Sequence, residues 1–346
     1  MNKVNKTTLP LFLKDTVLIT DILNNGFSTR FSIKKYVVIS ERQKHYRYIT
    51  RGCIYDSFGN KNLLSERIGV IGGDHVTALN PEFSRPKTWF KNRKEGNSLL
   101  LGIWMSHYGH FITETLSRLW IYNEIDQYEN LYIYPFIFGK GKTELKPYQA
   151  YFLGLLGIPS HKIKTLRNYT SFEKITIPEQ GWIANGRVSS GIHSIYKKIR
   201  EAHLSNNISY DRVFLSRRKS TYNRVINVSE VETIFELNNF SVIYPEELPI
   251  REQLIIYANC EVMAGFSGTA LHNCVFSREE TFVIEVADIR SESRMLPTQV
   301  AALELSGNEF AFIPYKENHC GEIDIKRLAE KLEECLKLSG DTSITG

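Results

Sequence analysis

Apolar runs and amphipathic stretches alternate most regularly between residues 211 and 286. Short apolar runs predict four strands, at residues 212–216, 241–244, 262–265 and 281–286. The spacing of apolar residues predicts three helices between them, at residues 229–237, 249–258 and 267–276. This alternation is typical of a doubly wound parallel sheet, which we therefore expect in this part of the chain.

This pattern predicts that two loops lie at the same edge of the sheet. In a parallel α/β sheet, ligands bind beyond the carboxyl ends of the strands, so loops that follow different strands share one edge. The loop at Arg217 follows the first predicted strand, and the loop at Gly265 follows the third. We expect both to line one ligand-binding edge. Ser229 and Glu232 have the spacing of a capping box, which predicts the start of the first helix.

The first half of the chain shows a weaker alternation of the same kind. Strands are predicted at residues 35–39, 68–71, 98–104 and 131–138, and helices at residues 109–125 and 147–156. A length of 346 residues suits two domains. We therefore predict an α/β protein of two Rossmann-like domains, residues 1–192 and 193–346. A last helix, at residues 323–338, could pack back on the first domain.

Composition narrows the class of protein. Hydrophobic residues make up 42% of the chain and charged residues 23%, as in soluble globular proteins. No apolar run reaches the ~18 residues of a membrane span. The net charge of +5 comes without a basic run, which argues against a nucleic-acid partner but suits an anionic ligand or peripheral contact with an anionic membrane. The five cysteines are scattered and form no C-x-x-C pair, which favours neither disulfides nor zinc and indicates the cytoplasm.

A polar stripe marks the helix predicted at residues 109–125. His110, Glu114 and Arg118 follow one another at intervals of four and share one face, whereas the rest of the surface is mostly apolar. Two interpretations stay open. The stripe is a solvent-exposed ladder of ion pairs, or it lines a cleft in which His110 or Glu114 acts as a general base on an acceptor hydroxyl.

A basic segment, Ser-Arg-Arg-Lys-Ser at residues 216–220, follows the first strand of the predicted sheet. Guanidinium groups present forked donors that match phosphate oxygens, and they keep their charge. An ordinary surface loop is the alternative. The position at the ligand-binding edge favours phosphate contact by Arg217 and Arg218, with Lys219 beside them.

The turn around Gly268 allows three interpretations. A nicotinamide site requires G-x-G-x-x-G and an acid about 20 residues later; Glu285 follows, but the middle glycine is missing. A serine-hydrolase elbow requires G-x-S-x-G, and Thr269 replaces its last glycine. A nucleoside diphosphate bound to free N–H groups at the start of a helix fits best. The predicted donor-binding residues are Arg217, Arg218, Lys219, Gly265, Ser267, Gly268, Thr269, His272, Asn273 and Glu285.

The sequence also bears on whether the reaction uses a metal ion. No Asp-x-Asp pair, a common holder of a divalent ion against a sugar diphosphate, occurs in the chain. Arginine side chains and a helix terminus would then offset the charge of the departing diphosphate. We expect a metal-independent reaction with no cofactor and no metal-binding residue.

Taken in order, these segments resemble glycosyltransferase family 61, which includes bacterial capsular polysaccharide biosynthesis proteins. The likeness is strongest over residues 213–286, with Ser-Arg-Arg after a strand, Glu-Glu-Leu at residues 246–248 and G-x-S-G-x-x-L-H-N-x-x-F at residues 265–276. Residues 110–119 resemble the family's N-x-x-H-W-x-x-[DE]-x-L-x-R-L element. The resemblance implies a GT-B architecture, in which two Rossmann-like domains face a central cleft, and an inverting reaction with a nucleotide-sugar donor.

The resemblance also implies roles for individual residues. Arg217 and residues 265–272 are expected to bind the donor, and His110 and Glu114 to serve as base or acceptor-side groups. His107 and Arg118 are predicted on the acceptor side.

The expected activity moves a hexosyl or pentosyl group from a uridine-linked donor to a saccharide or glycolipid acceptor in capsule or other surface-polysaccharide synthesis. Two alternatives stay open: a CMP-activated acidic sugar as donor, and a non-catalytic scaffold, suggested by Phe111 in place of the family's Trp. The sequence allows a homodimer and does not name the sugar, linkage or acceptor.

Overall fold

The computed structural model describes residues 31–39, 54–55, 61–62, 68–71, 74–77, 93–135, 145–165, 171–183, 188–220, 224–291, 294–314 and 321–339. The chain divides into two compact units. We call residues 26–199 the N-terminal unit and the unit that contains residues 200–346 the C-terminal unit. The division falls inside helix α4 (His193–Glu201), a few residues beyond the boundary predicted at residue 192.

The C-terminal unit is built on a five-stranded parallel sheet, as the alternation of strands and helices predicts. Its order is β11-β10-β12-β13-β14, and every neighbouring pair runs parallel. The strands are β10 (Tyr210–Leu215), β11 (Ser241–Ile243), β12 (Cys260–Phe266), β13 (Phe282–Val286) and β14 (Phe310–Ile313). The sequence pattern missed β14, a run of only four residues.

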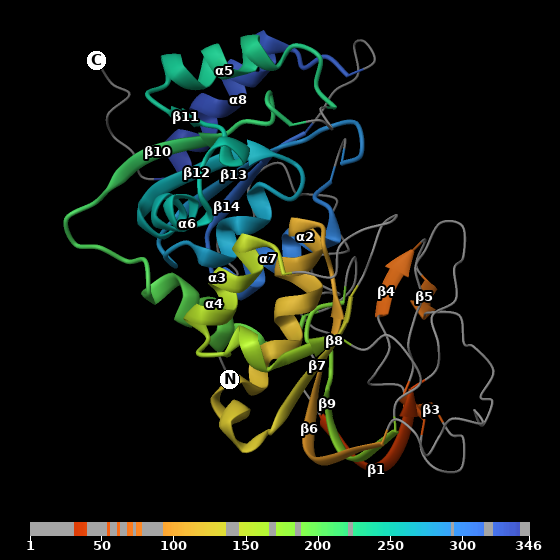
Figure 1. The fold of residues 1–346 in the computed structure, drawn as a ribbon. Coiled ribbons are helices and arrows are strands. Elements are labelled where there is room, and N and C mark those ends of the chain that lie inside the picture. Colours follow the sequence, from red (N-terminus) through yellow and green to blue (C-terminus); the bar gives the residue numbers. More distant parts are fainter. Residues whose placement is uncertain are drawn as a thin grey trace, which may run out of the picture. The chain divides into compact units, whose positions relative to one another are not determined.

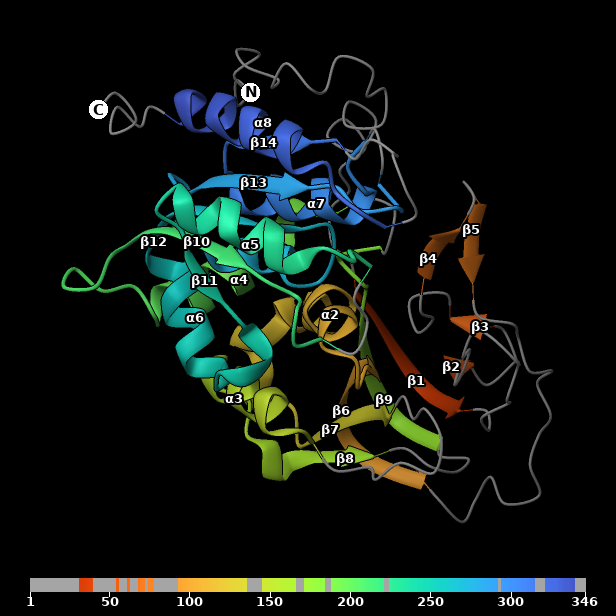
Figure 2. The same ribbon diagram turned by 90° about the horizontal axis from the view of Figure 1, so that it is seen from above.

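Helices cover both faces of this sheet (Figures 1 and 2). Helix α8 (Ile325–Leu338) packs against β14 and against α5 (Val228–Leu237), and these two helices lie side by side over one face. On the other face lie α6 (Ile250–Asn259), the 3-10 turn η7 (Leu271–Phe276) and α7 (Pro297–Ser306). The last helix packs on its own unit in this way, and the expected packing on the first domain stays a prediction.

Two helices differ from their predictions for clear reasons. Helix α7 was missed because it is buried almost all round, so its sequence lacks the polar side that marks a surface helix. Helix α5 begins after Asn227 without a side-chain cap, so the predicted capping box is wrong. The Glu232 carboxylate instead accepts a hydrogen bond of 2.5 Å from the Ser216 hydroxyl at the end of β10. Phe214 of β10 stacks on Phe235 of α5 with ring centroids 4.0 Å apart, a pairing that adds about 1 kcal/mol to the burial of the rings.

The N-terminal unit contains a mixed seven-stranded sheet, of order β3-β2-β1-β9-β6-β7-β8. Strands β9, β6, β7 and β8 are parallel, and β1, β2 and β3 continue the sheet with antiparallel pairing. A separate hairpin joins β4 (Ile68–Ile71) and β5 (Asp74–Thr77). This unit is therefore α/β with a parallel half, rather than parallel throughout. The bounds of the seven strands are β1 (Phe31–Ile39), β2 (Ile54–Tyr55), β3 (Lys61–Asn62), β6 (Arg93–Trp104), β7 (Asn130–Pro135), β8 (Ile163–Thr165) and β9 (Ser171–Pro178).

A continuous helical segment follows β6 and changes its winding twice. It consists of α2 (Tyr108–His110), a π-helical turn η2 (Phe111–Thr115) and a 3-10 stretch η3 (Leu116–Gln127), where the sequence predicted one regular helix. π-helical turns are rare and often occur at functional sites. Shorter helices complete the unit, namely α3 (Pro147–Leu155), η4 (Ser160–Lys162) and η5 (Ser190–Ile192). No helix among the described residues has the length and apolar character needed to cross a membrane.

Candidate functional site

The order of the C-terminal sheet marks a place for a ligand. Strand β10 lies between β11, its successor in the chain, and β12, which comes later. The order is that of the flavodoxin-like sheet, whose ligand binds beyond the carboxyl ends of the two strands where the order reverses. Here those strands are β10 and β12, with Leu215 paired to Gly265. The loops that begin at residues 217 and 267 follow them, as predicted.

Gly268 forms the tip of the turn after β12. Its φ of +133° is a conformation that side-chain-bearing residues rarely adopt. A Cβ at this position would lie 3.0 Å from Arg217 Nη1 and 3.2 Å from Arg290 Nη2. The backbone N–H groups of Gly268, Thr269 and Ala270 have no acceptor within the described part of the chain. The turn therefore offers free donors beside two guanidinium groups.

Arg217 and Arg290 lie at this turn, and Arg224 interacts electrostatically with both; we call these three residues the arginine cluster. Arg290 Nη2 donates a hydrogen bond of 2.6 Å to the Ser267 carbonyl, and Arg217 Nη1 donates one of 3.4 Å to the same oxygen. Burial lowers the pKa of Arg217, and the positive charges of Arg224 and Arg290 lower it further. Burial and Arg290 have the same effect on the pKa of Arg224. Like charges held this close are the arrangement that a bound anion relieves.

Asp288 orients one member of the cluster. Its carboxylate forms an ion pair with Arg290, with 2.6 Å between Oδ2 and Nη2, and it also accepts from Nε at 3.0 Å. The two-oxygen contact fixes the plane of the guanidinium group, as bidentate pairs do. Asp288 is 1% exposed, so Arg290 is held from the buried side of the turn.

A hydroxyl and carboxyl network supports the turn from below. The Ser267 hydroxyl donates to Glu285 and lies 2.6 Å from the Ser291 hydroxyl oxygen. Ser267 and Glu285 are completely buried, so both side chains support the turn from within, and their contact with a donor stays a prediction. Burial raises the pKa of Glu285 to about 8, which keeps this carboxyl group protonated at neutral pH.

Other residues predicted to bind the donor also pack within the unit around the turn. Gly265 lies inside β12, where a Cβ would be 3.4 Å from Leu215, so its small size serves strand packing. His272 is 8% exposed, and its Nδ1 lies 2.7 Å from Gln299 Oε1 on α7. The buried Asn273 amide donates to the Ala270 carbonyl at 3.0 Å. Of the residues predicted in this turn, Gly268 and the half-buried Thr269 remain beside the cluster.

The side chains of Arg218 and Lys219 form ion pairs with residues outside the arginine cluster. Arg218 forms an ion pair of 3.2 Å with Glu232 and donates a 2.5 Å hydrogen bond to the Tyr244 hydroxyl. Lys219 forms an ion pair of 3.3 Å with Glu247. Arg217 interacts with Arg224 and Arg290, whereas Arg218 is paired with Glu232, so contact of Arg218 with a diphosphate stays a prediction. The edge rule could have found Arg290, since it follows the carboxyl end of a predicted strand by four residues.

A histidine and a glutamate form a close pair after β6 in the N-terminal unit. His110 Nδ1 lies 2.5 Å from Glu114 Oε1. The His110 side chain is 45% exposed, whereas that of Glu114 is 3% exposed. This burial excludes the interpretation of the polar stripe as a solvent-exposed ladder. The His110–Glu114 pair has the form of an imidazole that a buried carboxylate orients, which leaves the second ring nitrogen for proton transfer.

Arg118 supports this pair from the interior. It is 2% exposed, and its Nη1 donates a 2.7 Å hydrogen bond to the Pro178 carbonyl. Burial lowers the pKa of Arg118 to about 10, and the carboxylates of Glu179 and Glu114 oppose this shift, so the group stays charged at neutral pH. Its position suits a counter-charge for the Glu114 carboxylate, and a contact of Arg118 with an acceptor stays a prediction.

Helix α3 fixes the loop between β6 and this pair. The Ser106 carbonyl accepts hydrogen bonds of 2.7 Å from Lys146 Nζ and 3.0 Å from the Tyr148 hydroxyl. The next residue, His107, is exposed, and its ring centroid lies 5.2 Å from that of His110. His107 therefore remains accessible to a substrate beside the His110–Glu114 pair.

Among the described residues, no group of three or more His, Cys, Asp or Glu side chains could hold a metal ion. The three cysteines described, Cys260, Cys274 and Cys335, are free and buried.

Comparison with known proteins covers both regions. No curated protein matches the chain in sequence. The family model described as Glycosyltransferase 61 matches residues 108–284, a stretch that includes the His110–Glu114 pair and the Gly268 turn. Because the match covers half of the 346 residues in the order that the sequence motifs predict, the chain belongs to glycosyltransferase family 61.

Proposed function

We propose that this glycosyltransferase transfers a sugar from a nucleoside diphosphate to a saccharide hydroxyl, with uridine diphosphate as the preferred carrier. The reaction inverts the configuration of the anomeric carbon and needs no metal ion. The observation that carries the proposal is the position of Arg217 and Arg290 beside the free N–H groups of the Gly268 turn, with Arg224 in electrostatic range of both. Fixed cations and oriented amides stabilise a leaving diphosphate because they need no reorganisation as its charge develops.

The proton of the acceptor hydroxyl goes to His110 in this proposal. Its Nδ1 faces the buried Glu114 carboxylate at 2.5 Å, and the exposed side of the ring carries Nε2. Glu114 therefore orients the ring and stabilises the imidazolium that forms, rather than acting as the base itself. Nε2 takes the proton while the acceptor oxygen bonds to the anomeric carbon and the bond to the diphosphate oxygen breaks.

The wider setting is also proposed. The donor binds the C-terminal unit and the acceptor the N-terminal unit, as the two halves of a GT-B enzyme. The acceptor is a saccharide or glycolipid of a capsule or another surface polysaccharide, and the enzyme works in the cytoplasm at the inner face of the membrane. These points rest on family membership and on the motifs of the sequence.

Titration calorimetry with a nucleotide panel, followed by transfer assays in EDTA, tests this function. We expect UDP to bind more tightly than CMP, and activity to persist after the chelator. Binding of CMP alone would favour an acidic-sugar donor. Binding of no nucleotide would favour a scaffold, and complete loss of transfer in EDTA, restored by a divalent ion, would refute the metal-free chemistry.

A further inference from the structure

A buried carboxyl group lies beneath the turn that the proposed function assigns to the diphosphate. Glu285 is the last residue but one of β13 and is completely buried. Its Oε1 contacts the hydroxyl of Ser267, the residue before Gly268. Its Oε2 is buried as well and has no hydrogen-bond partner among the described residues. A carboxylate with so few partners is costly to bury, so its state of charge depends on the groups around it.

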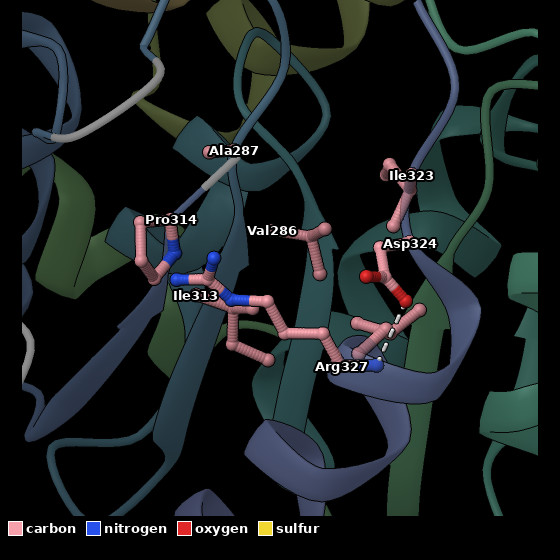
Figure 3. Close-up of a pocket in the computed structure, with 8 residues that line it drawn as sticks. Val286, Ala287, Ile313, Pro314, Ile323, Asp324 and Arg327 are labelled. Atoms are coloured by element: carbon pink, nitrogen blue, oxygen red, sulfur yellow. Dashed lines mark hydrogen bonds between the residues drawn. The ribbon is translucent and has the colours of Figure 1, made fainter. Parts of the chain in front are cut away.

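The charged groups of helix α8 lie on the wrong face of the sheet to balance Glu285. Successive residues of a strand point to opposite faces. The next residue, Val286, points toward α8, where it lines a small pocket together with Asp324 and Arg327 (Figure 3). Glu285 therefore points to the other face, on which η7 and α7 pack.

The elements on that face give Glu285 no counter-charge within the described part of the chain. Its partners in the neighbouring strands, Gly265 of β12 and Phe312 of β14, are uncharged. From η7 the buried thiol of Cys274 interacts with Glu285, and burial raises the pKa of this thiol to about 12, so it is neutral. Gln299 of α7, which donates to the Cys274 sulfur, is uncharged too.

The loop after β13 supplies one cation for two buried carboxyl groups. Burial raises the pKa of Glu285 most, the Asp288 carboxylate raises it further, and Arg290 lowers it. The Arg290 guanidinium is already in two-oxygen contact with Asp288, with 2.6 Å between Nη2 and Oδ2. Because one guanidinium balances one carboxylate, the second carboxyl group, that of Glu285, stays in its neutral form.

A bound diphosphate would be sensitive to this state. In the proposed function its charge lies on the Gly268 turn and against Arg290, the same guanidinium that acts on Glu285. A neutral carboxyl group adds no repulsion there. An ionised one would repel the ligand and would compete with it for Arg290.

We propose that Glu285 is a positioning residue for the donor diphosphate, and that it must carry its proton for the Gly268 turn to bind this anion tightly. The inference rests on the proposed function, because it requires the diphosphate to lie on the arginine cluster. Binding then takes up a proton in every molecule whose Glu285 is ionised beforehand.

Calorimetry of UDP binding to the full chain, in two buffers of different ionisation enthalpy, counts these protons. At about pH 8 Glu285 is half ionised in the free protein, whereas the terminal phosphate of UDP, with a pKa of about 6, is already ionised. We expect the wild type to take up about half a proton per UDP bound. The Kd for UDP should rise roughly fourfold between about pH 7 and about pH 8.5, as it does when only the neutral form binds.

Two variants assign the proton. Glu285→Gln keeps the size of the side chain and cannot ionise, so it should take up no proton, and its Kd should stay constant over this range of pH. The matched control is Glu304→Gln, since burial raises the pKa of Glu304 to about 7. Glu304 lies near the end of α7, which returns the chain to the opposite edge of the sheet, so this variant should take up protons as the wild type does.

The failures can be told apart. Equal proton uptake in Glu285→Gln and wild type would overturn the inference, and so would a wild type that binds UDP without taking up a proton. In both cases UDP binds, and the proposed function stands. If the wild type binds neither UDP nor inorganic pyrophosphate, the proposed function fails and this inference fails with it. Should Glu285→Gln not fold, Glu285→Met, uncharged and similar in size, is judged on the same proton count.

Discussion

The His110–Glu114 pair and the arginine cluster are assembled in opposite ways. The pair comes from one helical segment and from an i, i+4 spacing that is visible in the sequence. The cluster takes Arg217, Arg224 and Arg290 from loops as many as 73 residues apart, around a glycine that leaves room for two of them. Local spacing was enough to predict the first pairing, whereas only the strand order brings the residues of the second region together.

The contrast extends to chemistry. A half-exposed imidazole with a buried carboxylate behind it suits the transfer of one proton, which affects turnover. Several fixed cations suit the binding of an anion, which affects affinity as well as the stability of the leaving group. Mutations in the two regions should therefore alter different measured quantities, and the following predictions test that division from the largest effect to the smallest.

Removal of the imidazole should have the largest effect. We expect His110→Ala to lower kcat by roughly 10²- to 10⁴-fold, because a positioned general base contributes about that much, while the Kd for UDP stays unchanged. Glu114→Gln should lower kcat by at least about tenfold, since a neutral amide does not stabilise the imidazolium. Transfer kinetics measure both variants, and His161→Ala, an exposed histidine of the same unit, is the control. Full activity in His110→Ala would remove the pair from the mechanism.

Substitution in the cluster should alter binding instead. Arg217→Ala and Arg290→Ala should each weaken UDP roughly tenfold to a hundredfold, the value of a charge-assisted hydrogen bond, as measured by calorimetry. Arg218→Ala and Lys219→Ala should bind UDP as the wild type does, because those side chains are paired with Glu232 and Glu247. A loss of affinity in Arg218→Ala equal to that in Arg217→Ala would restore the pairing expected from the sequence and contradict the cluster.

A third prediction concerns the support of the His110–Glu114 pair. Gly102 has a φ of +85°, and a Cβ there would lie 2.2 Å from Arg118 Cδ. Gly102→Ala should lower the free energy of unfolding by about 2 kcal/mol or more, from the left-handed backbone and the displaced guanidinium. Gly154→Ala is the matched control, since nothing lies within 4 Å of its Cβ position in helix α3 and the change should be neutral or stabilising. Urea unfolding compares them, and equal midpoints for Gly102→Ala and wild type would contradict the tight packing.

Glu285, the buried carboxyl group beneath the Gly268 turn, should make the free energy of unfolding depend on pH. Its pKa is raised to about 8 in the folded chain from an ordinary value of 4.5, so between these values the folded state binds more protons than the unfolded state. Stability from this group should therefore be complete below pH 4.5 and decline as pH rises to about 8, by at most about 1.4 kcal/mol per pH unit. Glu285→Gln should flatten that part of the profile of thermal midpoint against pH. A slope unchanged in the variant would show that other groups produce it.

The sequence pattern predicted more of the elements of the C-terminal unit than of the N-terminal unit. In the C-terminal unit the apolar runs of β10, β12 and β13 are buried on both faces, so their sequences identify them directly. In the N-terminal unit β9 and the short β8 were missed, and the helix after β6 adopts π and 3-10 winding that apolar spacing does not reveal. The spacing of apolar residues predicts which residues share a face of a helix. It does not predict whether the backbone hydrogen bonds of a buried helix have α, π or 3-10 spacing.

The sequence by itself determined the α/β class, the parallel character of the C-terminal sheet, the edge where a ligand is expected and the shared helix face of His110 and Glu114. These follow from periodicity and from the rule that parallel strands end at a common edge, which act over a few residues or on whole elements. The tertiary structure decided which arginines meet at Gly268 and that Ser267 and Glu285 are buried supports of the turn. Such contacts depend on strand order and side-chain direction, and neither is encoded in the spacing of any one segment.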